Sequence, residues 1–267
     1  MTSTTASGRQ SEIELSGKIA IITGASRGIG RAIALRLATT GARLVLTARS
    51  EDALKDTAEG VKKLGTDVCC VATPDSSPER IVTAALTTFG HIDIVINNAG
   101  TTKHGDFPAL SDEDWKDGYE VKLFGAVRLC RTAWPELVRR HGSVINIAGV
   151  GGRTADARFT IGSSVNAAVM AFTKSLAQLG IEDGVQVNAV NPGHIRTDRL
   201  TQRITDACQR WGVGVEDAKN RMIKEFKIAR FGEPEEVAEL VTYLISPAGR
   251  LLQGALIDAD CGYTKGI

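Results

Sequence analysis

Residues 18–30 read Lys18-Ile19-Ala20-Ile21-Ile22-Thr23-Gly24-Ala25-Ser26-Arg27-Gly28-Ile29-Gly30, and this stretch decides the fold. The apolar run at 19–22 predicts a short buried strand, and the glycines after it predict a tight turn that opens a helix. In such a turn Gly24 permits the sharp change of direction, Gly28 lets backbone N–H groups approach a phosphate, and Gly30 allows close packing of helix on strand. The helix N-terminus would direct partial positive charge at a pyrophosphate. We therefore predict a nucleotide-binding unit rather than an ordinary tight turn.

Strands and helices alternate along the rest of the chain. Apolar segments predict further strands at 43–48, 67–72, 92–96, 143–148, 185–190 and 255–258. Amphipathic segments predict helices at 51–64, 79–89, 163–179 and 198–227, one from 233, and a long one from 112 that Pro135 kinks or ends. This alternation predicts a parallel sheet covered on both faces, with ligands at the carboxyl ends of its strands. Residues 13–267 are expected to form one α/β domain behind a disordered Ser/Thr-rich tail at 1–12.

Composition excludes several classes of function. With 267 residues and 43% hydrophobic content, the chain can bury a sizeable core. Its net charge of +1 gives no reason to expect nucleic acid or a membrane as partner. The five cysteines show no zinc-ligand spacing, so we expect a reduced, cytoplasmic protein without a metal site. No apolar run approaches the roughly 20 residues of a membrane-spanning helix.

The end of the second strand indicates which cofactor is bound. An acidic residue there would bind the ribose 2′-hydroxyl of NAD, but this chain has Arg49, and Arg27 lies in the glycine-rich turn. Arginine forms charge-assisted, often bidentate bonds to phosphate. Two guanidinium groups at the ribose end therefore favour NADP(H), with NAD(H) as the alternative if both arginines are merely solvated surface residues.

Three further motifs follow in order: Asn97-Asn98-Ala99-Gly100, Asn191-Pro192-Gly193-His194-Ile195-Arg196-Thr197 and Gly232-Glu233-Pro234-Glu235-Glu236-Val237-Ala238. With the glycine-rich turn they resemble the short-chain dehydrogenase/reductase family, over essentially the whole chain from Leu15 to Tyr263. The resemblance implies a seven-stranded, doubly wound Rossmann-type sheet, assembly as homotetramers or homodimers, and a nicotinamide cofactor across the strand ends. The cofactor contacts expected from these motifs and from Arg49 are Gly24, Ser26, Arg27, Gly28, Ile29, Gly30, Arg49, Asn98, Ala99, Gly100, Pro192, Gly193, Ile195 and Thr197.

Four positions depart from the pattern of that family. Its members reduce a carbonyl or oxidise an alcohol with a tyrosine acid/base, a lysine four residues later, a serine that holds the substrate oxygen, and an asparagine on the preceding long helix. The alignment puts Gly162 at the tyrosine position and Asn166 at the lysine position. Gly149 stands at the serine position and Lys122 at the asparagine position. The usual proton donor is therefore missing from this expected site.

Three residues are candidate replacements. Lys122 would contact the nicotinamide ribose or the substrate oxygen, and a partly desolvated lysine has a lowered pKa and donates a proton near neutrality. His194 would exchange a proton at physiological pH, and Asn166 would take over the ribose contact. The alternatives are a surface lysine and a histidine that packs or faces solvent. We expect the substrate pocket to be lined by Gly149, Phe159 and Gly162.

These residues favour an atypical NADP(H)-dependent oxidoreductase acting on a small-molecule ketone, quinone or diketone. A catalytically silent cofactor-binding subunit is the second interpretation. The third is a non-redox lyase or hydrolase in which Lys122 acts as an electrophile or forms a Schiff base. Intact cofactor motifs favour the first two, whereas the four changed positions favour the last two.

Overall fold

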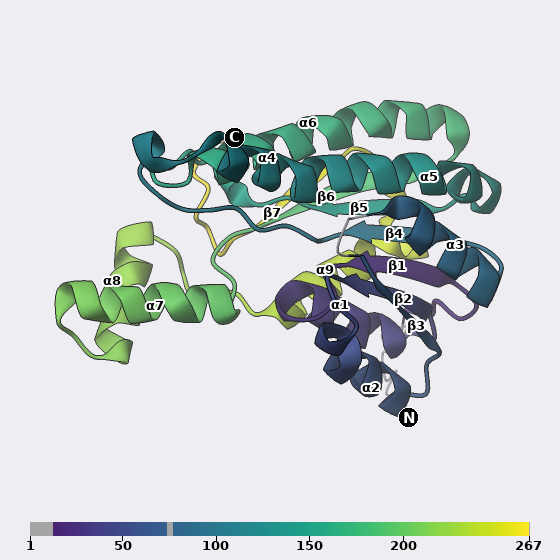
Figure 1. The fold of residues 1–267 in the computed structure, drawn as a ribbon, viewed down its shortest axis with the longest axis horizontal. Coiled ribbons are helices and arrows are strands. Elements are labelled where there is room, and N and C mark those ends of the chain that lie inside the picture. Colours follow the sequence, from purple (N-terminus) through teal and green to yellow (C-terminus); the bar gives the residue numbers. More distant parts are fainter. Residues whose placement is uncertain (1–12, 74–76, 267) are drawn as a thin grey trace, which may run out of the picture.

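Seven short strands pair side by side in one parallel sheet (Figure 1). The structure is a computed structural model that describes residues 13–73 and 77–266, so the expected tail at 1–12 lies outside the described residues. The strand order is β3-β2-β1-β4-β5-β6-β7, in which the chain starts in the middle and winds outward twice. This confirms the predicted doubly wound α/β sheet. The strands are β1 (Ile19–Thr23), β2 (Arg43–Ala48), β3 (Val68–Ala72), β4 (Ile94–Asn97), β5 (Ser143–Ile147), β6 (Gln186–Pro192) and β7 (Leu256–Ala259).

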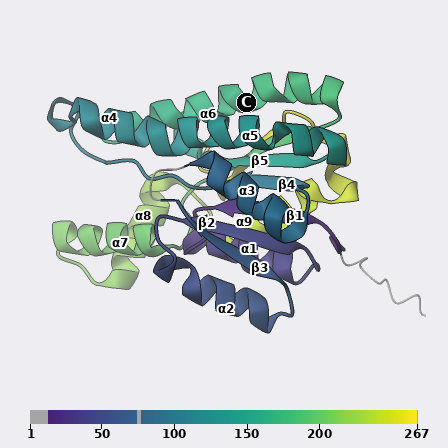
Figure 2. The ribbon, with the colours of Figure 1, turned by 45° about the vertical axis from the view of Figure 1, so that its right-hand side comes forward.

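Helices cover both faces of the sheet (Figures 1 and 2). Alternate residues of β1 show the division: Ile22 packs in the core beneath one helical layer, and Ile21 packs in the core beneath the other. Both faces are buried, which explains the continuous apolar runs of the strands. One layer holds α1 (Gly28–Ala38), α2 (Lys55–Lys63) and α9 (Pro234–Ile245), and the other holds α3 (Pro78–Phe89), α5 (Gly125–Arg140) and α6 (Thr160–Asp183).

The long helix expected from residue 112 is interrupted. It begins as α4 (Asp112–Tyr119), passes through one π-helical turn, η3 (Glu120–Phe124), and continues as α5. Pro135 lies inside α5 and does not end it, which corrects one of the two expectations for that residue. A π-helical turn widens the helix locally, and such turns are frequent at functional sites. Here the turn carries Lys122.

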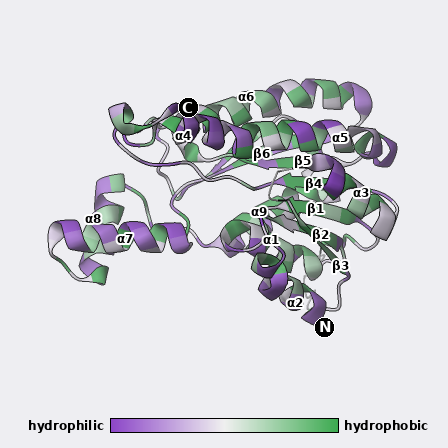
Figure 3. Cartoon of the chain, in the orientation of Figure 1, coloured by the Kyte–Doolittle hydropathy of each residue, from purple (hydrophilic) through white to green (hydrophobic). Residues whose placement is uncertain are grey.

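The helical segment expected at 198–227 is two helices, α7 (Asp198–Trp211) and α8 (Val215–Phe226). Gly212 ends α7 in the left-handed conformation, with φ of +62°, a common helix stop for glycine. The two helices stand out from the body of the molecule (Figures 1 and 2) and have apolar and polar sides (Figure 3). They enclose a small core of their own, which includes Leu200, Ile204, Met222 and Phe231.

In the described part of the chain, no helix has the length and apolar character needed to cross a membrane. All five cysteines lie in that part and are free thiols.

Candidate active site

The glycine-rich turn joins β1 to α1 and is held by the end of β4. Asn98 donates its side-chain N–H to the carbonyl oxygens of Thr23 (2.9 Å) and Gly24 (3.1 Å). Gly24 has a φ of +64°, in the region that favours glycine. A methyl group at position 30 would overlap the Gly24 carbonyl and the Asn98 amide. The turn therefore keeps its shape only with glycine at these two positions.

The N-terminus of α1 suits an anion. Arg27 precedes the helix without making a side-chain cap, and the first turn contains no acidic residue. The first backbone N–H groups of a helix have no partner within the helix. At α1 these groups are available to a phosphate, together with the positive end of the helix dipole. The cradle thus fits the pyrophosphate of a dinucleotide.

The two arginines of the expected ribose end are both solvent-exposed. Arg49 follows the carboxyl end of β2, and Arg27 lies in the glycine-rich turn with its Nη1 3.6 Å from Asp198 Oδ2. Neither guanidinium is buried in the protein, so each is free to move toward a ligand.

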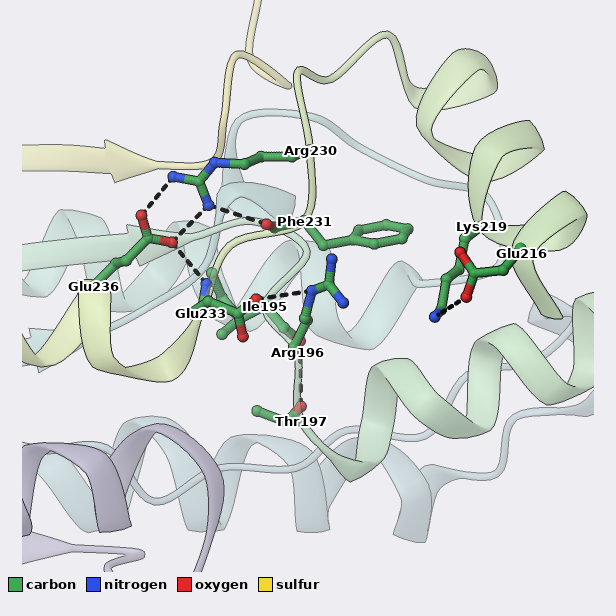
Figure 4. Close-up of polar contacts among 9 residues, drawn as sticks. All are labelled: Ile195, Arg196, Thr197, Glu216, Lys219, Arg230, Phe231, Glu233 and Glu236. Carbon is green, nitrogen blue, oxygen red and sulfur yellow. Dashed lines mark hydrogen bonds and ion pairs between the residues drawn. The ribbon is translucent and has the colours of Figure 1, made fainter.

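The loop after β6 is anchored at both sides. The backbone N–H of Gly193 donates to the Ala259 carbonyl (3.0 Å), and Ile195 pairs with Gly232. Figure 4 shows the polar contacts around this loop, in which Arg196 binds Glu233 at 2.9 Å and Arg230 binds Glu236. The methyl group of Thr197 would lie 3.2 Å from a Cβ at Gly28, so the loop borders the glycine-rich turn.

Lys122 lies at the carboxyl end of β5. Its Nζ donates a hydrogen bond to the Ala148 carbonyl at 2.7 Å, and its aliphatic chain packs against Gly100. Burial, together with the positive charge of Arg199, lowers the pKa of this lysine to about 7. The ammonium therefore exchanges its proton in the physiological pH range. The catalytic role expected for Lys122 stays a prediction.

Asn166 is 3% exposed and lies against the Gly149 turn. A side chain at position 149 would meet Asn166 Nδ2 at 3.1 Å. Within the described residues its Oδ1 has no hydrogen-bond partner. A buried polar atom left without a partner is costly and indicates a ligand or a water at that point.

Phe159 occupies the space beside Gly162. Any side chain at position 162 would overlap the Phe159 ring. The other face of the ring stacks on His104, with ring centroids 4.2 Å apart and an interplanar angle of 18°. The structure therefore places Phe159, Gly162 and His104 together, whereas Gly149 lies against Asn166; that these residues line a substrate pocket stays a prediction.

His194 packs between aromatic rings. Its ring stacks on Phe226 at 4.2 Å and meets the edge of Tyr263 at 4.9 Å. Arg203 Nη1 lies 3.3 Å from His194 Nδ1. Burial lowers the pKa of His194 to about 4, and the Arg203 charge adds to this effect. The imidazole is therefore neutral at pH 7, where it is a poor proton donor and can at most accept one.

Two surface cavities lie at opposite ends of the sheet. A small cavity of about 50 Å³ lies at the carboxyl ends and is lined in part by Thr23, Asn97, Ala99 and Lys122. A larger, open hollow of about 530 Å³ borders Arg43, Val68 and Phe89 near the amino ends of β2 and β3. We place the site at the carboxyl ends, because the polar side chains converge there and parallel α/β sheets bind ligands there.

Sequence reasoning missed three residues of this region, namely His104, Arg199 and Arg203. The two arginines lie on α7, where charges at helical spacing look like any solvated face. His104 lies in the loop after β4, in no recognisable motif.

Comparisons with known proteins agree on one family. The family model described as enoyl-(acyl carrier protein) reductase matches residues 24–264. The 3-oxoacyl-(acyl-carrier-protein) reductase of Vibrio cholerae is 32% identical over 251 residues, which cover 94% of this chain and 98% of that protein. The structure of L-sorbose reductase from Gluconobacter frateurii, complexed with NADPH and L-sorbose, has a TM-score of 0.90 and 33% identity, covering 96% of this chain and 99% of that one. A 7α-hydroxysteroid dehydrogenase complexed with NADH and 7-oxo glycochenodeoxycholic acid has a TM-score of 0.83 and 27% identity, covering 93% and 95%.

Proposed function

The chain belongs to the short-chain dehydrogenase/reductase family, and from this premise we propose that it is an NADP(H)-dependent oxidoreductase with an atypical active site. It reduces a small carbonyl compound, or oxidises the corresponding alcohol, with Lys122 in place of the tyrosine and lysine of the family. The observation that carries the proposal is the partly buried Lys122 at the strand ends, whose Nζ donates to Ala148 O at 2.7 Å; desolvation lowers its pKa to about 7.

The cofactor fits the residues at the strand ends. When bound, a reduced nicotinamide supplies a hydride. The N-terminus of α1 would hold the pyrophosphate, Arg27 and Arg49 the ribose 2′-phosphate, and Asn166 the nicotinamide ribose through its unpartnered amide oxygen. L-Sorbose reductase is complexed with NADPH and the hydroxysteroid dehydrogenase with NADH, so both cofactors occur among the similar structures.

Lys122 would donate the proton that carbonyl reduction requires. Its hydrogen bond to Ala148 O holds Nζ at the end of β5, and its lowered pKa makes the ammonium a stronger acid than a solvated lysine. General acid catalysis is typically worth about 10²–10⁴-fold in rate. A lysine here would thus replace the proton donor that the family has as a tyrosine at the position of Gly162.

The proposal is tested by following NADPH oxidation with a panel of ketones, diketones and quinones. We expect turnover with at least one class of carbonyl compound. NADPH binding without any turnover would indicate a silent subunit instead. Trapping of a carbonyl compound on Lys122 by borohydride, detected by mass spectrometry, would indicate the Schiff-base chemistry of a lyase.

Changing Arg49 to aspartate should reverse the cofactor preference. The substitution removes a charge-assisted bond to the 2′-phosphate and places a carboxylate where it repels that group, so NADPH affinity should fall about 10- to 100-fold. NADH affinity should change little, which a fluorescence titration with both cofactors measures. Arg43→Asp, at the amino end of the same strand, is the matched control. An equal loss of affinity for NADPH and NADH in Arg49→Asp would overturn the assignment of Arg49 to the 2′-phosphate.

We also propose that the protein works as a homodimer or homotetramer in the cytoplasm. Exposed apolar side chains at Leu179, Ile181 and Leu251 support association, and the free cysteines fit a reducing compartment. Light scattering coupled to size-exclusion chromatography gives the number of subunits.

A further inference from the structure

Arg199 and Arg203 lie one helical turn apart on α7. Arg199 lies near Lys122, and both arginines lie near His104. Arg199 Nη2 donates to the Gly100 carbonyl at 3.3 Å. Arg203 packs its guanidinium over the Phe226 ring at 5.6 Å and lies 3.3 Å from His194 Nδ1. Arg203 is thus partly buried against the protein, whereas Arg199 is exposed and tethered by one hydrogen bond.

Neither guanidinium has a carboxylate within 4 Å in the described part of the chain. The charges that act on Arg199 are cationic, whereas Asp156 and Tyr263 act on Arg203 in the opposite sense. Desolvation lowers the pKa of Arg199, and the charges of Arg27 and Arg203 add to this effect. Desolvation also lowers the pKa of Arg203, although Asp156 acts in the opposite direction from farther away. Partly desolvated charges that lack an opposite charge are costly, and a bound anion would offset that cost.

Contacts join these arginines to the candidate active site. Gly100 accepts the hydrogen bond from Arg199 on its carbonyl, and a Cβ at this position would lie 2.9 Å from Lys122 Cδ. His104 stacks on Phe159, the ring that fills the space beside Gly162. The positive charges of Arg203 and Arg199 both lower the pKa of His104, so the two guanidiniums lie near that wall. One neighbourhood therefore holds Lys122, the aromatic wall and both arginines.

We propose that Arg199 and Arg203 bind an anionic group of the substrate, so that the substrate is a ketone bearing a carboxylate or a phosphate. This inference rests on the proposed function and specifies its substrate class. The anion would lie against α7 and its carbonyl group against Lys122. In the reaction the carbonyl carbon accepts a hydride from NADPH, which becomes NADP⁺. The oxygen accepts a proton from Lys122, and the resulting neutral amine regains a proton from solvent.

Arg203 distinguishes a substrate site from a cofactor site. Arg199 lies near Arg27, whose charge acts on it, and therefore also near the glycine-rich turn. Arg203 lies one turn farther along α7, beside His194 and Phe226. If the pair served the cofactor phosphates, changing Arg203 would weaken NADPH binding. A substrate site predicts instead that NADPH binding is unchanged.

The kinetic test compares matched substrates in the wild-type protein and in Arg203→Gln. Methyl esters serve as neutral partners for 2-oxo and 3-oxo carboxylates, and dihydroxyacetone serves as the neutral partner for dihydroxyacetone phosphate. We expect Arg203→Gln to raise KM about 10- to 100-fold for one anionic class, the usual effect of losing a charge-assisted bond. The kcat for the anionic ketones and the KM for the neutral ketones should change little. Arg210→Gln, at the far end of α7, is the control.

Two results would overturn the proposal. One is an equal rise in KM for the charged and the neutral ketones in Arg203→Gln. The other is a parallel loss of NADPH affinity in the same variant, which would assign the pair to the cofactor. Whichever anionic class responds identifies carboxylate or phosphate as the bound group.

A binding measurement separates this proposal from the proposed function. With saturating NADPH present to fill the cofactor phosphate sites, we expect malonate or inorganic phosphate to raise the Tm of the wild-type protein and of Arg210→Gln but not that of Arg203→Gln. If this holds while no ketone is reduced, the anion site stands and the oxidoreductase function fails. If neither anion raises the Tm of the wild-type protein, the anion site fails.

Discussion

Replacing Lys122 with methionine should lower the kcat for ketone reduction about 100-fold or more, because general acid catalysis contributes about 10²–10⁴-fold. Methionine keeps most of the length of the side chain and its packing against Gly100, but it cannot donate a proton. Hydride transfer from a held cofactor would account for the residual rate, since positioning alone lowers the barrier by several kcal/mol. NADPH affinity should stay close to that of the wild-type protein.

The rate of ketone reduction should also depend on pH through Lys122. Lys122 donates a proton only in its charged form, so reduction should slow as the pH rises through about 7. In Lys122→Met this step in the pH profile should disappear. Lys116→Met, an exposed lysine of α4 that pairs with Glu113, should keep both the rate and the profile. Near-normal turnover of Lys122→Met would make Lys122 a structural residue.

Stability should respond to pH through the same group. The pKa of Lys122 is about 7 in the folded protein and 10.5 for a fully solvated lysine, so between these values the unfolded chain binds more protons. The free energy of unfolding of the wild-type protein should therefore rise with pH over this window, relative to Lys122→Met. Below pH 7 the full cost of burying the ammonium is present. Urea titrations of both proteins at pH 6 and pH 10 measure the difference.

Removing the carboxylate of Asp93 should destabilise the fold by about 3 kcal/mol, the range for a buried charge network that loses one partner. Asp93 is 1% exposed and lies just before β4, at the end of the sheet opposite the site. It accepts hydrogen bonds from Lys18 Nζ (3.0 Å), Arg140 Nε (3.1 Å) and the backbone N–H of Ile19 (3.0 Å). Asp93→Ala would leave the Ile19 N–H buried without this acceptor.

Urea unfolding of a matched series tests this role. Asp93→Asn keeps an oxygen that accepts from Ile19 and should lose less stability than Asp93→Ala. Glu182→Ala, at an exposed position of α6, should fall within about 0.5 kcal/mol of the wild-type protein. If all three variants have similar unfolding midpoints, the Asp93 network contributes little to stability.

The sequence predicted the elements more reliably than their boundaries. Continuous apolar strands and the order of the motifs led to the correct doubly wound sheet. The expected helix at 198–227 was wrong in its middle, where Gly212 stops α7, because an amphipathic pattern does not show where two short helices turn back on each other. The π-helical turn at 120–124 was also missed, since one extra residue in a helical turn hardly alters the spacing of apolar positions.

In the candidate site too, the sequence predicted some features and missed others. Cofactor contacts such as Gly24, Gly30 and Arg49 stay predictions, although the glycine-rich turn has the close packing that they require. Lys122 was singled out by its position in the motif order, and the burial that lowers its pKa agrees with that choice. His194 was expected to exchange protons near neutrality, but its packing against Phe226 and Tyr263 makes it neutral there.

The sequence by itself determined the parallel sheet and the glycine-rich turn after its first strand. These features are local, because strand periodicity and glycine spacing act over a few neighbouring residues. Only the tertiary structure decided that His104 stacks on Phe159 and that Arg199 lies near Lys122. Those relations join residues from separate elements, and desolvation and charge coupling depend on distances through space, which the order of residues along the chain does not specify.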